Sequence, residues 1–128
     1  MCFDFPKMRL EFSCANNNLI LIRDGELKFF EADKMAVGRS PRQEISFTNQ
    51  TFELKTGDFI SAYTDGYADQ FGGEKGKKFK YKQLEDLILK NNQLHCEEKK
   101  KLLFETMQSW KGKLEQVDDI LVAGIKIS

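Results

Sequence analysis

The feature that most constrains the fold of this 128-residue chain is a short turn, Asp24-Gly25, between two apolar segments. Leu19-Ile20-Leu21-Ile22 precedes the turn and Leu27-Lys28-Phe29-Phe30 follows it. A type I′ turn needs positive φ at both central positions, so Asp-Gly at this place predicts a tight β-hairpin. The two segments are therefore expected to be antiparallel neighbours in a sheet.

Further strands are expected on both sides of this hairpin. Residues 9–12 form an apolar segment that leads into it, and residues 59–63 form another that ends at Thr64-Asp65-Gly66. Alternation in residues 45–47 and 52–54, around Asn49-Gln50, predicts a second hairpin with one buried face. Residues 120–125 are almost wholly apolar, which predicts a strand covered on both faces.

Helical periodicity replaces strand alternation in the C-terminal part of the chain. Two amphipathic helices are expected, the second beginning near Glu97-Glu98 and ending before Gly112, which suits a C-terminal cap. Residues 72–82, rich in Gly, Lys and Glu, predict an exposed mobile loop. The fold class is therefore α+β, with antiparallel sheets and two helices. The periodic apolar residues are Leu84, Leu87 and Ile88 in the first helix and Leu103, Met107 and Trp110 in the second.

Charge and composition exclude two classes of partner. The chain has 20 basic and 20 acidic residues, whereas binding to nucleic acid or an anionic membrane normally shows as a basic excess. No apolar stretch approaches the roughly 18–20 residues that span a bilayer, and the N-terminus lacks the features of a signal peptide. Three cysteines without a Cys-x-x-Cys pair fit a reducing compartment, so a cytoplasmic location is expected.

Carboxylates at strand ends are the residues that most suggest chemistry. Asp65 follows one apolar segment and Asp118-Asp119 precedes another. Mg²⁺ and Mn²⁺ prefer oxygen ligands, so the two positions are candidates for one metal site. Thr-Asp-Gly is also an ordinary turn, and an Asp pair before a strand is often a solvated edge. His95-Cys96 is a weaker candidate, as a nucleophilic pair, because sequence neighbours seldom meet in the required geometry; a surface or helix-capping histidine is the preferred interpretation.

The order of several short motifs resembles the C-terminal half of the PP2C-type metal-dependent Ser/Thr phosphatases of bacteria, in the SpoIIE and RsbU branch. Each motif is weak by itself, but their order and strand context are specific, and the resemblance covers residues 12–127. The motifs are Ser13-Cys14-Ala15-Asn16-Asn17 before the Asp24-Gly25 hairpin, Val37-Gly38, Leu54-Lys55-Thr56-Gly57-Asp58, Tyr63-Thr64-Asp65-Gly66 and Glu115-Gln116-Val117-Asp118-Asp119-Ile120.

The resemblance implies a partial α-β-β-α sandwich and a role for each aspartate. Asp65 and Asp118 match the family's ligands for Mn²⁺ or Mg²⁺, and Gly66 would let the backbone turn closely beside the ion. Asp69 would serve a weaker accessory metal, with Asp119 behind the ligands. In such enzymes two metal ions activate a water that attacks phosphoserine or phosphothreonine. The family also implies a phosphoprotein substrate, such as an anti-anti-sigma-type protein, and an N-terminal sensor or receiver module.

One departure from the family limits what is expected of the chain. The family's N-terminal half supplies a Gly-Asp pair and a further Asp-Gly as metal ligands, and residues 1–17 contain neither; Asp4 lies between two phenylalanines. Residues 1–128 are therefore interpreted as the C-terminal part of a phosphatase domain without its N-terminal part. Two carboxylates alone hold a divalent cation weakly, so little or no turnover is expected from the isolated chain.

Alternatives to a catalytic role come from the lysine-rich segment and from the truncation. Lys75, Lys77, Lys78 and Lys80 suit contact with an acidic phosphoprotein, although a solvated loop is the favoured interpretation. A catalytically inert interaction module with the phosphatase sheet is a second hypothesis. A dimerisation domain is a third, because half a sandwich exposes sheet edges that another copy would cover as a homodimer.

Overall fold

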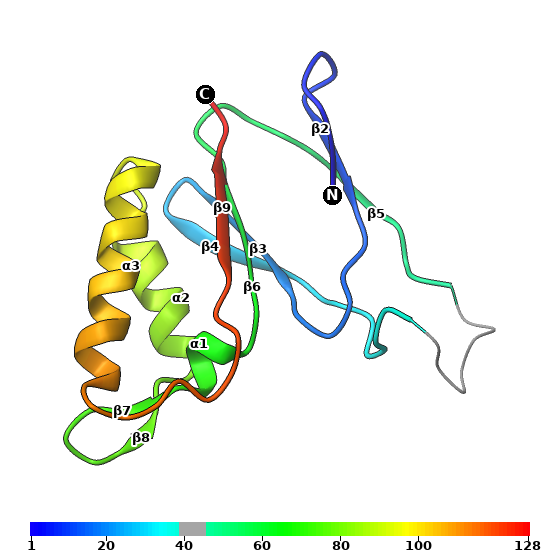
Figure 1. Ribbon diagram of the computed structural model, residues 1–128. Coiled ribbons are helices and arrows are strands. Elements are labelled where there is room, and N and C mark those ends of the chain that lie inside the picture. Colours follow the sequence, from blue (N-terminus) through cyan, green and yellow to red (C-terminus); the bar gives the residue numbers. More distant parts are fainter. Residues whose placement is uncertain (39–45) are drawn as a thin grey trace.

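Two antiparallel sheets and a helical layer form the fold, which the computed structural model describes for residues 1–38 and 46–128 (Figure 1). The α+β class expected from the sequence is confirmed. The first sheet has the order β1-β2-β5 and the second β4-β3-β6-β9. The first sheet contains β1 (Cys2–Asp4), β2 (Arg9–Phe12) and β5 (Gln50–Glu53), and the second contains β3 (Leu19–Arg23), β4 (Glu26–Phe30), β6 (Phe59–Tyr63) and β9 (Val122–Lys126).

The predicted hairpin is confirmed residue by residue. β3 and β4 pair from Leu19 opposite Phe30 to Arg23 opposite Glu26, with the turn between them. Asp24 has φ 52° and Gly25 has φ 80°, the left-handed values that a type I′ turn requires. The turn chemistry therefore sets the register of this half of the sheet.

Alternate residues of the central strands face two different cores. Ile20 and Ile22 of β3 pack toward the helices, whereas Leu19 and Leu21 pack toward the first sheet. In Figure 1 the helices lie on one side of the four-stranded sheet and the β1-β2-β5 sheet lies on the other. Because β3 is covered on both faces, nearly all its side chains are apolar.

Helices α2 (Tyr81–Lys90) and α3 (Cys96–Lys111) form the helical layer, as their periodicity predicts. Gly112, with φ 55°, ends α3 at the expected position. A third helix, α1 (Gly66–Asp69), was not predicted; it is a single turn directly after β6. No helix in the described part of the chain is long and apolar enough to cross a membrane.

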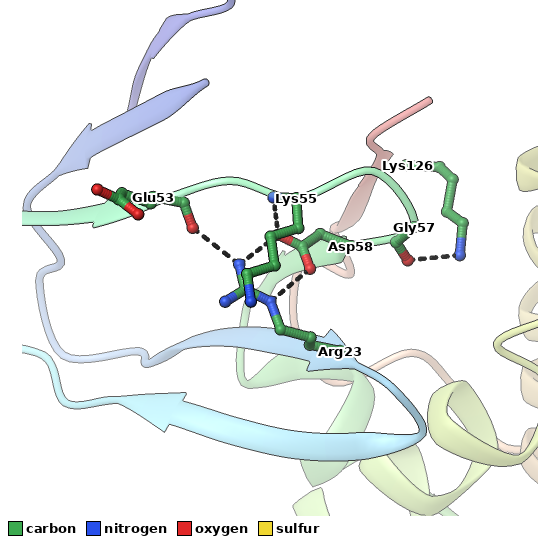
Figure 2. A network of polar contacts seen from close by, with 6 residues as sticks. All are labelled: Arg23, Glu53, Lys55, Gly57, Asp58 and Lys126. Carbon is green, nitrogen blue, oxygen red and sulfur yellow. Dashed lines mark hydrogen bonds and ion pairs between the residues drawn. The ribbon is translucent and has the colours of Figure 1, made fainter. Parts of the chain in front are cut away.

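An ion pair joins the two sheets where β5 leads into β6 (Figure 2). Arg23, at the end of β3, donates through Nε to one oxygen of Asp58 at 2.8 Å and through Nη2 to the other at 2.7 Å. The same Nη2 donates to the carbonyl of Glu53 in β5 at 2.8 Å, and the N–H of Lys55 donates to Asp58 at 2.8 Å. Asp58, in the Leu-Lys-Thr-Gly-Asp motif, therefore has a structural role.

Most residues of the segment 72–82 are exposed, as expected, but the prediction that the whole segment is a loop is wrong. β7 (Phe71–Gly72) and β8 (Lys77–Lys78) pair as a short antiparallel hairpin. Phe79 follows β8 and is buried, with ring centroids 5.1 Å from Tyr67 and 5.2 Å from Trp110. The lysines and glycines suggested a solvated loop, but this one aromatic side chain anchors the segment to the core.

Two strand predictions also need correction. β9 was expected to be covered on both faces, but it is the edge strand of its sheet, and Ala123 and Gly124 are exposed. The second hairpin is absent from the described residues, because β5 pairs with β2 and Ser46 to Asn49 form no strand. Ile45, which belonged to that prediction, lies outside the described residues.

Candidate functional site

The two aspartate segments meet at one end of the four-stranded sheet. β6 and β9 are antiparallel, with Tyr63 opposite Val122, so the residues after β6 lie beside those before β9. Thr64 extends this pairing: its N–H donates to the carbonyl of Leu121 at 3.0 Å, and its Oγ1 donates to the carbonyl of Asp119 at 2.8 Å. The placement of Asp65 and Asp118 on neighbouring segments agrees with the sequence prediction.

Gly66 is in direct contact with the opposite segment. A Cβ built on Gly66 would lie 2.4 Å from the carbonyl oxygen of Asp119 and 3.3 Å from the carbonyl carbon of Asp118. No side chain fits in that space, so glycine is what allows the two backbones to approach this closely. The resemblance placed Gly66 beside an ion, and the geometry adds that it packs against the backbone carrying Asp118.

The carboxylates of this region differ in their partners. Asp65 is exposed and stands at the N-cap of α1, but its side chain makes no capping hydrogen bond. One oxygen of Asp118 accepts the N–H of Asp119 at 2.7 Å, a contact within the turn itself. Asp119 is exposed and uses its main chain, not its carboxylate, to meet Thr64. Among the residues that the structure describes, Asp65 and Asp118 therefore keep carboxylate oxygens free for a ligand.

Asp69 is tied to the lysine-rich hairpin. Its carboxylate pairs with Nζ of Lys78 at 3.0 Å, and this Nζ also lies 5.9 Å from the ring centroid of Phe71. The hairpin that carries the lysines is thus beside α1, one turn from Asp65. Lys75, Lys77, Lys78 and Lys80 are all exposed.

Tyr81 reports the electrostatic character of the site. Burial raises the pKa of its hydroxyl, and the negative charges of Asp65, Asp69 and Glu85 raise it further. Glu85, one turn along α2 from Tyr81, also accepts the hydroxyl hydrogen of Tyr63 at 2.8 Å. Sequence inspection missed Glu85, since nothing but helical spacing connects it with residues 65 and 69. The site is acidic, as a cation site requires.

The carboxylates of the site are the right type of ligand for a hard divalent cation, but they are too few to complete its coordination. Carboxylate oxygens are the ligands that Mg²⁺ and Mn²⁺ prefer. Within residues 1–38 and 46–128, however, no group of three or more His, Cys, Asp or Glu side chains is placed to hold one ion. Asp65 and Asp118, with Asp69 nearby, would therefore supply part of a coordination shell.

His95 occupies a helix-capping position, the interpretation preferred from the sequence. It is the N-cap residue of α3, and its N–H donates to the carboxylate of Glu98 at 2.9 Å. Cys96 is the first residue of the helix and is exposed.

Comparisons with known proteins identify the family and the fold of the chain. The family model for stage II sporulation protein E (SpoIIE) matches residues 1–128. Among solved structures, the SiaA-PP2C domain of Pseudomonas aeruginosa is 25% identical, with a TM-score of 0.86 over 98% of this chain and 49% of that chain.

Two more distant structures share the fold. The SpoIIE phosphatase domain of Bacillus subtilis, solved with a fragment of its regulatory domain, is 17% identical, with a TM-score of 0.71 over 98% of this chain and 36% of that one. The catalytic domain of the phosphatase PstP, in complex with two manganese ions, is 20% identical, with a TM-score of 0.56 over 94% of this chain and 54% of that one. No curated protein sequence matches. The chain thus spans about half or less of the structures it resembles.

Proposed function

The chain belongs to the SpoIIE family, and on that premise we propose that it forms the metal-binding C-terminal part of a protein phosphatase domain that hydrolyses phosphoserine or phosphothreonine. One observation carries the proposal. Gly66 packs against the backbone of Asp118 and Asp119, which holds two carboxylate-bearing turns side by side at the end of the sheet.

Each residue of the site has a proposed part. Asp65 and Asp118 bind Mn²⁺ or Mg²⁺, and Gly66 keeps their segments in contact. Asp69 assists a weaker accessory ion, and Asp119 lies behind the ligands. What a divalent cation supplies when bound is Lewis acidity toward water and phosphoryl oxygens. The ion pair between Lys78 and Asp69 places the lysine-bearing β7–β8 hairpin beside the site. These lysines suit contact with an acidic phosphoprotein.

The remaining ligands are proposed to come from the rest of the domain, because the chain spans about half of the SiaA structure and contains no group of three ligands within its described residues. Low turnover by the isolated chain follows. An anti-anti-sigma-type substrate, a sensor or receiver module and a role in bacterial signalling remain part of the proposal. The free thiols of Cys2, Cys14 and Cys96 support a cytoplasmic setting.

The test is a Mn²⁺ titration of the 128-residue chain, followed by paramagnetic broadening of its amide NMR signals. Broadening is expected first around Asp65, Gly66, Asp118 and Asp119. Asp65→Asn and Asp118→Asn should each remove it, whereas the exposed Asp86→Asn should not. Broadening centred elsewhere, or unchanged in both site variants, would contradict the proposal. Hydrolysis of an aryl phosphate with and without Mn²⁺ measures what turnover the chain retains.

An interaction module remains the second candidate, and the exposed edge of β9 favours it. β9 ends its sheet, so the backbone donors and acceptors on its outer side are open to another strand. Leu121, just before β9, is 61% exposed and adds an apolar side chain at this edge. Under this hypothesis the chain forms a homodimer or binds another protein without metal. Sedimentation velocity of the chain, with and without Mn²⁺, separates the candidates: a Mn²⁺-indifferent dimer without broadening at Asp65 favours the module.

A further inference from the structure

Gln70 is a completely buried polar residue directly after α1, with a relative exposure of 0%. A buried amide is costly unless it is hydrogen-bonded. Its Nε2 donates to the carbonyl of Glu115 at 2.9 Å and to that of Phe71 at 3.1 Å, and its Oε1 accepts the N–H of Val117 at 3.4 Å. Two of these three contacts reach the segment that carries Asp118.

The main-chain carbonyl of Gln70 is also hydrogen-bonded. It accepts the N–H of Phe79 at 3.0 Å and the indole Nε1–H of Trp110 at 3.0 Å. These partners belong to the segment after β8 and to the last turn of α3. The main chain of Gln70 is therefore anchored to the core, while its side chain bonds the segment that carries Asp118.

Among the described residues, few contacts connect the segment between α3 and β9 to the rest of the fold, and Gly66 packs against it only at Asp118 and Asp119. Its side chains from Gly112 to Asp119 are exposed, and it contains no helix or strand. Gln70 bonds it at residues 115 and 117, and Thr64 bonds it at residues 119 and 121. Asp118 lies between these two attachments. Both attachments come from residues near the two ends of α1, the helical turn whose N-cap is Asp65.

We propose that Gln70 is a positioning residue for metal binding: it holds Asp118 at a fixed place relative to Asp65. The inference rests on the proposed function, because it concerns the same ion. Without Gln70 the segment would be attached only on the C-terminal side of Asp118. Metal binding would then have to order the segment, and the lost conformational entropy would lower metal affinity. Removing a residue that orients a metal ligand typically lowers metal affinity by about 10- to 100-fold. We therefore expect the loss of Gln70 to lower Mn²⁺ affinity by about tenfold or more.

The test is the Mn²⁺ titration applied to Gln70→Met, which keeps an unbranched side chain of similar length and removes the amide. The amides of residues 114–118 should become more mobile in ¹⁵N relaxation, and the Mn²⁺ dissociation constant should rise about tenfold or more. Gln93→Met, at an exposed glutamine, is the composition control and should change neither quantity. Tyr67→Phe, which loses a hydrogen bond to the carbonyl of Leu103, is the stability control. It should lower the midpoint of unfolding and leave Mn²⁺ affinity intact.

The outcomes separate the two proposals. Wild-type chain without Mn²⁺ binding at Asp65 and Asp118 overturns the proposed function and this inference with it. Wild-type binding together with equal binding by Gln70→Met overturns the inference alone. Should Gln70→Met not fold, hydrogen exchange of wild-type chain decides: the Val117 amide should be protected although its side chain is exposed, and an unprotected amide would refute the attachment by Gln70.

Discussion

Arg23 and Asp58, 35 residues apart, form a two-point ion pair in which the carboxylate is almost completely removed from solvent. Arg23 also reaches the carbonyl of Glu53, so one guanidinium connects β3, β5 and the start of β6 (Figure 2). These strands belong to different sheets. The pair therefore fixes how the first sheet packs on the sheet that carries the candidate site.

Replacing Asp58 is expected to lower stability substantially. Asp58→Asn puts an amide N–H₂ group against the Arg23 donors and leaves a partly buried cation without its counter-ion. Removing one partner of a buried pair costs about 3–5 kcal/mol, and the partial exposure of Arg23 argues for about 3 kcal/mol. Urea unfolding at neutral pH measures it, with Asp86→Asn on the exposed face of α2 as the matched control. Equal midpoints for the two variants would show that the pair contributes little.

The same carboxylate predicts how stability depends on pH. Burial alone would raise the pKa of Asp58, but hydrogen bonds from Arg23 and the Lys55 N–H outweigh it and hold the pKa below the ordinary value of 3.8. A lowered folded pKa means that the stabilisation is complete above the unfolded value and is lost as pH falls through the folded one. Wild-type chain should therefore lose more stability than Asp58→Asn on acidification below about pH 4. Parallel stability curves for the two proteins in that range would exclude this explanation.

Local signals in the sequence predicted the elements whose structure depends on local chemistry. Asp24-Gly25 fixes a hairpin by its turn conformation, and the periodicity of α2 and α3 is visible in the chain itself. β9 was mispredicted because a strand of apolar residues has the same pattern at the centre or the edge of a sheet. The β7–β8 hairpin was missed because its order depends on Phe79 packing against Trp110, more than 30 residues further on.

The candidate site was predictable only in part, for a similar reason. Asp65 and Asp118 stand at strand ends, and antiparallel pairing of β6 with β9 brings strand ends together. Glu85 and Gln70 contribute through tertiary contacts to Tyr63 and Val117, which no spacing in the sequence predicts. A buried glutamine looks the same in sequence as any surface glutamine.

Gly72→Ala is expected to disrupt the packing of the β7–β8 hairpin on α3. A Cβ at this position would lie 2.0 Å from the carbonyl oxygen of Trp110 and 2.6 Å from Cδ1 of its indole ring. The neighbouring Gly73 N–H donates to the same carbonyl at 2.8 Å, so the backbones cannot separate without losing that bond. Overpacking of this kind costs about 1–3 kcal/mol, and Trp110 fluorescence together with thermal unfolding should report it.

Gly76→Asn is the control for that prediction. Gly76 lies in the same hairpin with φ 55° and nothing within 4 Å of an added Cβ. Asparagine tolerates this left-handed conformation, so the change should alter stability by about 0.5 kcal/mol or less. If Gly72→Ala were as mild as Gly76→Asn, the close contact with Trp110 would not be important for stability.

Lys99 is a buried cation held by neutral partners. Its Nζ donates to the carbonyls of Asn92 and Leu94, both at 2.8 Å, and lies 4.2 Å from the ring centroid of Phe59. Lys99→Met keeps the apolar stem but leaves the two carbonyls without their donor, while it removes the cost of burying a charge. Since an unsatisfied buried acceptor costs about 1–3 kcal/mol, we expect a net loss of about 1–2 kcal/mol at neutral pH.

The pH dependence of this loss separates the two effects. Burial lowers the pKa of Lys99 below its ordinary value of 10.5, with the charge of Lys126 adding to the decrease. Lys99 in the unfolded chain then keeps its proton to higher pH than Lys99 in the folded chain. The free energy of unfolding of the wild-type chain therefore increases as pH rises from the folded pKa toward 10.5. The advantage of wild-type chain over Lys99→Met should therefore be larger at pH 9.5 than at pH 7 in urea unfolding. An advantage that shrinks over that interval would mean that the charged form of Lys99 is favoured by the fold, contrary to the lowered pKa.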